Sequence, residues 1–232
     1  MAPVYSICIT NYNTIDTIKE SLESILDQID ERFEVIVVDN YSTDGSREIL
    51  ENYARQGKIK LILEKCTRGR GRQIAFENSH GDYIISGLDM DDVFYPVLKE
   101  ILKIYHSKYE GCLGLIKGQI SPRWVAEAIG WKDLQSREDM DYIRRASRLV
   151  PVVELYPMDK FVKIGKNHWR KNLINRARER FVKYLCMYEL KENPWEVEIK
   201  YNPWYDKFPL IIIAILAKVW KRVRKAQIML KN

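Results

Sequence analysis

The chain has 232 residues, of which 46% are hydrophobic, 11% aromatic and 30% charged. This composition is too apolar and aromatic for a disordered protein, and it carries no collagen or coiled-coil signature. The net charge of +6 is unevenly placed, because residues 1–159 hold 20 basic and 26 acidic side chains whereas residues 160–232 hold 18 and 6. We therefore expect a globular domain over residues 1–158 and a basic helical region over residues 159–232 that favours an anionic partner.

The cysteines and the N-terminus predict a cytoplasmic protein. The sequence holds four widely spaced cysteines and no Cys-x-x-Cys pair. This spacing fits neither a zinc site nor a disulfide framework, and it favours a reduced chain. Residues 1–3 lead straight into a strand-like segment without the basic start and apolar core of a secretory signal.

Strand-like and helix-like segments alternate along the first half of the chain. Their expected positions are 4–10, 34–39, 58–64 and 83–88 for the strands, and about 15–26, 46–56 and 72–79 for the helices. Such alternation predicts an α/β fold with a doubly wound, mainly parallel sheet and helices on both faces. In sheets of this kind the ligand site lies beyond the carboxyl ends of the strands.

Three carboxylates follow strand 83–88, in the segment Leu88-Asp89-Met90-Asp91-Asp92. Gathered at a sheet edge, they would repel one another, and a divalent cation would relieve that repulsion. Hard oxygen ligands suit Mg²⁺ or Mn²⁺, which often bridge carboxylates to substrate phosphates. The alternative is an Asp-rich turn that caps a helix beginning near Pro96.

Two more polar loops are expected at the same edge, over residues 10–13 (TNYN) and 39–46 (DNYSTDGS). Together with Asp89-Met90-Asp91-Asp92, they resemble family-2 glycosyltransferases of the GT-A fold. In that family successive strands end in (P/T)-x-Y-N, V-V-D-(D/N)-x-S-x-D-G-S and D-x-D-D. The resemblance covers roughly residues 4–148, and it implies a Rossmann-like GT-A fold that transfers a sugar from a nucleotide-sugar donor.

The resemblance implies donor-binding roles for the first two loops. Thr10 and Tyr12 would hold the nucleobase and ribose, with Tyr12 placed to stack on the base. Asp39 or Asn40 would bond the base edge. Many members of the family have a second Asp where this chain has Asn40, and an amide donates as well as accepts hydrogen bonds. The donor base therefore stays open between a UDP-sugar and a GDP-sugar.

The resemblance also assigns the metal and diphosphate contacts. Asp89 matches the acid that faces the ribose, and Asp91 matches the metal ligand, with Asp89 as a second ligand. A Mn²⁺ or Mg²⁺ ion would neutralise the charge that develops on the leaving diphosphate. Arg72 ends the RGRGR stretch over 68–72, which we expect between the third strand and the next helix, contacting the diphosphate. An RNA-binding fragment and a dinucleotide fingerprint are the alternatives for this stretch.

A catalytic base is expected in the segment 131–145, which resembles the family's E-D-x-x-x-x-x-R motif. Asp139 is the first candidate to deprotonate the acceptor hydroxyl, and Glu138 is the second. The alternative is that both acids are favoured by the dipole at a helix start and pair with arginines one turn later.

The C-terminal region predicts a helix on a membrane surface. The apolar run over 208–217 has ten residues, half of the roughly 20 that span a bilayer. Over about 208–230, an apolar stripe and a basic stripe lie on different sides of a helix, as in helices that lie on anionic membranes. The alternative is a helix that docks on its own domain.

These observations predict a metal-dependent inverting glycosyltransferase, cytoplasmic and peripheral on the membrane, with a glycan or lipid-linked acceptor and no nucleic-acid partner. A nucleotidyltransferase of related fold would need a Gly-rich basic loop after the first strand, which residues 10–13 do not provide. A basic nucleic-acid-binding module would leave the acidic cluster without a purpose. The absence of a GxxxxGK[ST] motif argues against a P-loop enzyme.

Overall fold

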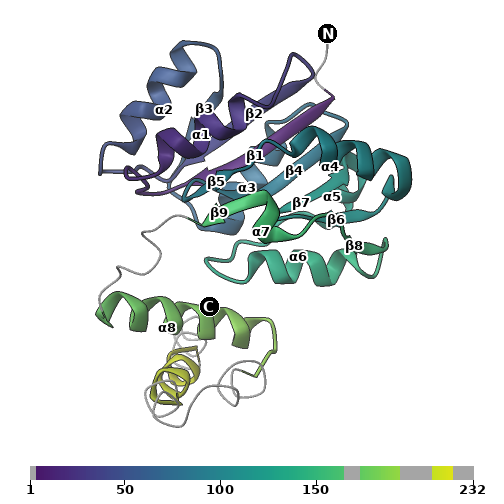
Figure 1. Cartoon of the computed structure of the whole chain (residues 1–232). Helices are drawn as coiled ribbons and strands as arrows, with labels where there is room; N and C mark the ends of the chain where they lie inside the picture. The colour runs from purple at the N-terminus through teal and green to yellow at the C-terminus, as the bar shows by residue number, and fades with distance from the viewer. Residues whose placement is uncertain (1–3, 165–172, 194–210, 222–232) are drawn as a thin grey trace. The chain divides into compact units, whose positions relative to one another are not determined.

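The computed structural model describes residues 4–164, 173–193 and 211–221 (Figure 1). The chain divides into two compact units, which are Met1–Asp133 with Glu138–Trp169, and Leu134–Arg137 with Arg170–Asn232. The first unit reaches past the boundary expected at residue 158. The reason is that strand β9 (Val162–Ile164) pairs antiparallel with β5 (Asp92–Phe94).

The first unit is built on a seven-stranded sheet of order β3-β2-β1-β4-β7-β6-β8. Its strands are β1 (Tyr5–Asn11), β2 (Phe33–Asp39), β3 (Lys60–Leu63), β4 (Tyr83–Asp89), β6 (Leu113–Leu115), β7 (Gln119–Pro122) and β8 (Val152–Glu154). Strands β1 to β4 run parallel, whereas β7 is antiparallel to both β4 and β6. The expected doubly wound, mainly parallel α/β sheet is confirmed.

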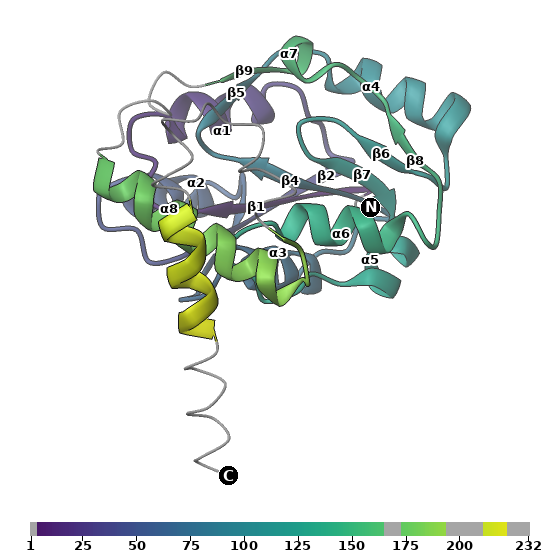
Figure 2. The ribbon, with the colours of Figure 1, turned by 90° about the horizontal axis from the view of Figure 1, so that it is seen from below.

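Helices cover both faces of this sheet. They are α1 (Ile18–Leu26), α2 (Ser46–Arg55), α3 (Arg68–Glu77), α4 (Leu98–Ile104), α5 (Arg123–Ile129) and α6 (Glu138–Ala146), with a π-helical turn (Tyr105–Tyr109) and a short α7 (Met158–Phe161). Figure 2 shows α1 and α4 on one side of the sheet and α3, α5 and α6 on the other. Side chains alternate along a strand, so Ile7 and Ile9 of β1 pack with α1, whereas Cys8 packs with α3.

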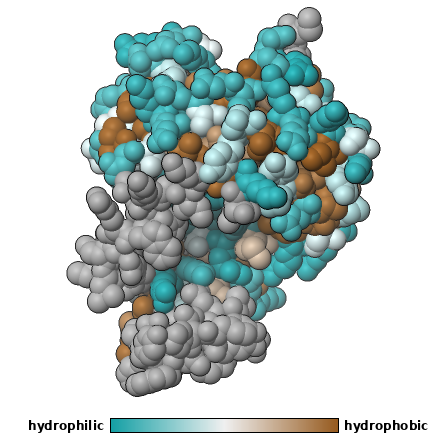
Figure 3. Space-filling model, viewed as in Figure 1, coloured by the Kyte–Doolittle hydropathy of each residue, from teal (hydrophilic) through white to brown (hydrophobic). Residues whose placement is uncertain are grey.

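The surface of the first unit contrasts with these buried layers. The face seen in Figure 3 is mostly hydrophilic, with small groups of hydrophobic side chains among polar ones, as is usual for a folded protein in water.

A β-bulge in β4 decides which way its last residues point. Ser86 pairs with Cys8 and Leu88 with Ile9, so Gly87 between them has no partner in β1 and adopts φ +78°. In a regular strand Ile85 and Leu88 would lie on opposite faces, yet both belong to the core cluster on the α1 side. The extra residue therefore directs Asp89 toward the α3 side of the sheet.

Helix α3 begins earlier than the sequence predicts. Its N-cap is Thr67, whose Oγ1 accepts a hydrogen bond from Arg70 N at 3.2 Å. The expectation of an RGRGR loop is therefore wrong, because these residues form the first turns of the helix. Gly71 is required there by close packing, since a Cβ at this position would lie 2.9 Å from Thr10 Cγ2.

The second unit contains helix α8 (Leu173–Glu189) and a helical segment over 211–221. Ala214 and Ala217 of that segment are buried with Tyr184 and Met187 of α8. Larger apolar side chains of the same segment stay exposed, namely Ile212, Ile215, Leu216, Val219 and Trp220.

The helix predicted over 208–230 is therefore helical over 211–221. Its remaining residues, 208–210 and 222–230, lie outside the described part of the chain. Among the residues that the structure describes, no helix combines the length and apolarity that crossing a bilayer requires.

Candidate active site

The three polar loops meet at the carboxyl edge of the parallel strands, as the sequence predicts. Asn11, at the end of β1, donates from Nδ2 to Asp39 Oδ2 at 2.8 Å, at the end of β2. Thr17, just before α1, donates from Oγ1 to the carbonyl oxygen of Met90 at 2.8 Å. These contacts hold the loops after β1, β2 and β4 side by side.

The expected donor-binding residues differ in how accessible they are. Asp39 is completely buried, and its carboxylate accepts hydrogen bonds from Asn11 and from the backbone and hydroxyl of Ser42. Asn40 Oδ1 accepts from Cys66 N at 3.0 Å. Tyr12 is 58% exposed, and its ring is available for stacking. Thr10 is half-buried. The roles of these residues in binding a base stay predictions.

A cavity of about 200 Å³ lies beside the end of β4. Most of its walls come from α3, the ends of β4, the β6–β7 hairpin and the start of α6, through Arg68, Arg72, Gly87, Asp89, Leu115, Ile116, Lys117, Gly118, Gln119, Glu138, Asp139 and Ile143. It therefore brings together Arg72, Asp89 and both candidate bases, which lie far apart in the sequence.

Arg72 forms the buried centre of this arrangement. Its side chain is only 4% exposed, with Nη1 2.9 Å from Glu138 Oε1 and Nη2 3.4 Å from Asp89 Oδ1. The guanidinium lies over the ring of Trp131, with its centre 5.0 Å from the ring centroid. Arg72 thus connects the strand that carries Asp89 to the helix that carries Glu138 and Asp139.

The three clustered carboxylates lie together as the sequence predicts, and Asp92, which is not among the expected metal ligands, lies with Asp89 and Asp91. One carboxylate oxygen from each of Asp89, Asp91 and Asp92 lies within 4.8 Å of the others. Oxygens that share one divalent cation lie at most about 4 to 5 Å apart, because metal–oxygen distances are about 2.0 to 2.6 Å. Asp91 is exposed and Asp89 half-buried. The donor set therefore fits a hard divalent cation.

Burial and the neighbouring charges shift the pKa values of these carboxyl groups in opposite directions. Burial raises the pKa of Asp89, but Arg72 and Lys117 outweigh burial and hold this pKa below its usual range. Burial raises the pKa of Asp92, and the nearby Lys117 ammonium only partly opposes the shift. Burial likewise raises the pKa of Glu138 against the opposing effect of Arg72 and Arg68.

The two candidate bases occupy different environments at the start of α6. Glu138 is 2% exposed, and its carboxylate forms an ion pair with Arg72. Asp139 is exposed and lines the cavity. Of the two, Asp139 has the solvent-accessible side chain.

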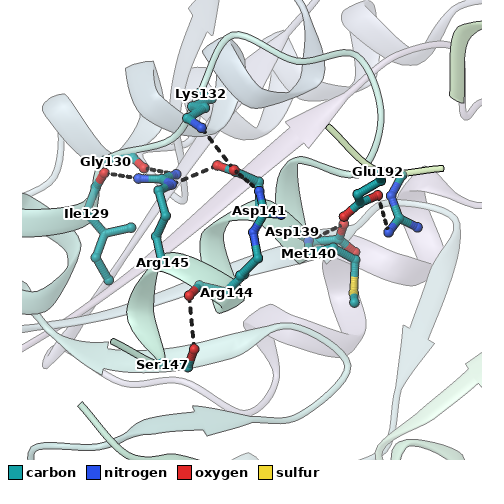
Figure 4. A network of polar contacts seen from close by, with 11 residues as sticks. Ile129, Gly130, Lys132, Asp139, Met140, Asp141, Arg144, Arg145, Ser147 and Glu192 are labelled. Atoms are coloured by element: carbon teal, nitrogen blue, oxygen red, sulfur yellow. Dashed lines mark hydrogen bonds and ion pairs between the residues drawn. The ribbon is translucent and has the colours of Figure 1, made fainter. Parts of the chain in front are cut away.

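Helix α6 is fixed by an ion-pair network around Asp141 (Figure 4). The Asp141 side chain is completely buried, with Oδ1 3.0 Å from Lys132 Nζ and Oδ2 2.7 Å from Arg145 Nε. Arg145 also donates to the carbonyl oxygens of Ile129 and Gly130 at the end of α5. This network holds the helix whose first turn presents Glu138 and Asp139.

Sequence reasoning missed Lys117 and Trp131. Lys117 lies at the turn of the β6–β7 hairpin and reaches Asp89 and Asp92. A Lys-Gly pair between two apolar stretches could have indicated this hairpin. Trp131 contributes its ring beneath Arg72, a contact that no local motif indicates.

The model of Glycosyl transferase family 2 matches residues 6–142, more than half of the chain, and the protein therefore belongs to this family. Among curated relatives, it is 33% identical over 134 residues to the poly(ribitol-phosphate) beta-glucosyltransferase of Bacillus spizizenii, covering 53% of this chain and 20% of that protein. The chain spans 13% to 36% of the length of eight curated relatives that it matches.

Solved structures share the GT-A fold of the first unit. The mannosyltransferase PcManGT from Pyrobaculum calidifontis, in complex with GDP-Man and Mn²⁺, superposes with a TM-score of 0.62 at 18% identity, covering 93% of this chain and 70% of that one. S. aureus TarS 1–349, in complex with UDP, has a TM-score of 0.59 at 18% identity, covering 80% and 65%. The predicted GT-A fold and family are thus confirmed.

Proposed function

We propose that this protein transfers a sugar from a nucleoside-diphosphate donor to an acceptor hydroxyl, in a reaction that depends on a divalent cation and inverts the anomeric carbon. The observation that carries this proposal is the cavity beside β4, where Asp89 and the exposed Asp139 line the same space. Family membership supports glycosyl transfer over a nucleotidyltransferase or a nucleic-acid-binding module. UDP and GDP-Man in the two related structures support a nucleotide-sugar donor.

The donor side of the site is supplied by the strand ends. Asp89, Asp91 and Asp92 would hold Mn²⁺ or Mg²⁺, which supplies positive charge to the leaving diphosphate. Arg68 lies in the cavity wall and would add a guanidinium contact to the phosphates. The expected base-binding residues, Tyr12 and Asn40, belong to the neighbouring loops. Asp39 is buried and would hold the loop after β2 in place. It would bond the base edge only after a local rearrangement.

The acceptor side is supplied by α6. The acceptor hydroxyl oxygen forms a bond to the anomeric carbon as the bond from that carbon to the diphosphate oxygen breaks, and the bonding electrons leave with the diphosphate. Asp139 takes the hydroxyl proton. Glu138, paired with Arg72, acts as a positioning residue that keeps Asp139 and Asp89 in the wall of the same cavity.

The acceptor is proposed to be a glycan or a lipid-linked molecule presented at an anionic membrane surface. Support comes from the helical segment over 211–221, where Ile212, Ile215 and Leu216 are each about half exposed. Trp220 and the exposed Lys218 belong to the same segment. Large apolar side chains beside basic ones are the pattern of helices that lie in the headgroup layer.

Donor binding and hydrolysis test the proposal. Thermal-shift measurements with UDP, GDP and their sugars, with and without Mn²⁺, identify a donor because a ligand that binds the folded state raises the Tm. Asp91→Asn and Asp139→Asn should each lower transfer to the identified acceptor at least about a hundredfold. The matched control is Asp82→Asn, at an exposed site just before β4. Unchanged turnover in Asp91→Asn, or no hydrolysis of any nucleotide-sugar, would contradict the proposal.

A further inference from the structure

The Lys117 side chain pairs with two of the three carboxylates of the acidic cluster. Its Nζ lies 3.3 Å from Asp89 Oδ2 and 3.1 Å from Asp92 Oδ2. Both residues belong to the set of three that fits a divalent cation. A cation on these carboxylates and the Lys117 ammonium would therefore share ligands.

The backbone holds Lys117 in this place. The next residue, Gly118, lies so close to β4 that a Cβ would be 2.2 Å from the carbonyl oxygen of Ser86. Gly87, the bulged residue, lies opposite Gly118, and a Cβ at Gly87 would be 3.3 Å from Gly118 Cα. Two glycines thus let the hairpin turn rest against the strand end, which brings Lys117 to the carboxylates.

The charges at this position oppose cation binding. Three carboxylates supply a charge of −3, and the ammonium already neutralises part of it while contacting two of them. A divalent cation on the same oxygens would lie within several ångströms of the ammonium, where like charges repel strongly in a partly buried site. A nucleoside diphosphate brings negative charge that can satisfy both positive groups.

We infer that Lys117 is a built-in counter-ion that holds the acidic cluster together before the donor binds and weakens cation binding until a nucleoside diphosphate is present. The inference rests on the proposed function. It makes Lys117 a positioning residue for the cation site, and it implies that donor and cation bind with positive coupling. By linkage, each increases the affinity for the other by the same factor.

Titration of the 232-residue chain with Mn²⁺ alone tests this inference, with free Mn²⁺ followed by electron paramagnetic resonance. Lys117→Met should bind Mn²⁺ at least tenfold more tightly than the wild-type protein. The matched control, Lys103→Met, removes the same charge at an exposed position of α4 and should bind like wild type. Adding Asp91→Asn to Lys117→Met should abolish the gain, which assigns it to this cluster.

Lys117→Arg keeps the charge and should retain the wild-type affinity. Equal Mn²⁺ affinity in wild type and Lys117→Met, or an equal gain in Lys117→Arg, would overturn the inference. Lys117→Gln serves the same comparison if the Met variant does not fold. Because this titration contains no nucleotide, its failure is distinct from failure of the proposed function, which would appear as an absence of donor hydrolysis in the wild-type protein.

Discussion

Arg72 Nη1 lies 2.9 Å from Glu138 Oε1, and the two side chains are only 4% and 2% exposed. The pair joins α3 to the first turn of α6 in the wall of the cavity. Because Asp139 follows Glu138 directly, the geometry of this pair sets where the proposed base lies relative to Asp89.

Replacing Glu138 by Gln should therefore affect both stability and turnover. Removing one member of a buried pair costs about 3 to 5 kcal/mol of unfolding free energy. We expect a loss toward the lower end of this range, because Arg72 keeps Asp89 as a charged partner at 3.4 Å. Urea unfolding measures this loss, and Glu127→Gln, at an exposed position of α5, is the control. A loss below about 0.5 kcal/mol would mean that the pair does not stabilise the fold.

Asp141 should make stability depend on acid pH. Burial raises the pKa of Asp141, but hydrogen bonds from Lys132 and Arg145 outweigh burial and lower it. A lowered pKa contributes stability above the unfolded-state value of about 3.9, and this contribution is lost as the pH falls through the folded-state value.

Asp141→Asn should accordingly lose about 2 kcal/mol at pH 7, with some screening because Lys132 is half exposed. The difference from wild type should shrink as the pH falls from about 5 to about 3. Urea unfolding at several pH values measures it. A difference that is equal at pH 7 and at low pH would show that the carboxylate charge is not its cause.

Gly118→Ala should destabilise the first unit more than Gly111→Ala. A Cβ at Gly118 would meet the Ser86 carbonyl oxygen at 2.2 Å, whereas Gly111 has open space around it and only its φ of +93° disfavours a side chain. We expect a loss of about 3 kcal/mol at Gly118 and about 1 kcal/mol at Gly111. Thermal unfolding compares the two variants, and equal losses would argue against close packing of the hairpin on β4.

Exposed apolar residues of the segment 211–221 should control membrane binding. Leu216→Glu removes a side chain that is 54% exposed and should weaken binding to anionic phosphatidylglycerol vesicles at least about tenfold, since burying a leucine contributes about 2 kcal/mol. Vesicle flotation measures the effect. Leu149→Glu, 49% exposed in the first unit, is the control. Equal vesicle binding by both variants and the wild-type protein would refute the proposal that this segment binds a membrane surface.

Much of the fold was predictable because its signals are local. Short apolar runs that alternate with segments of helical periodicity predict a parallel sheet. Because parallel strands end at the same edge of a sheet, Asp39 and Asp89, which end two of these strands, are expected at that edge. The hydrogen bond between Asn11 and Asp39 realises that expectation directly.

The remaining features depend on contacts between distant segments. The early start of α3 follows from the Thr67 cap and from the fit of Gly71 against Thr10, and neither is visible in the pattern of residues 68–72. The burial of Arg72 depends on Trp131 and Glu138, which are about 60 residues away. The sequence identifies these residues, but it does not show whether the Arg72 guanidinium is free to contact a substrate or forms ion pairs with acidic side chains of the protein.

The bulge at Gly87 determines which face of the sheet each of the last residues of β4 points to. Removing or adding one residue between Tyr83 and Asp89 would reverse the directions in which the last side chains of β4 point. The carboxylate of Asp89 would then enter the hydrophobic core under α1, and Leu88 would face Arg72. Chimeras assembled from related chains should therefore place their junctions outside this strand and keep its number of residues from Tyr83 to Asp89 unchanged. This holds whatever sugar the parent proteins transfer.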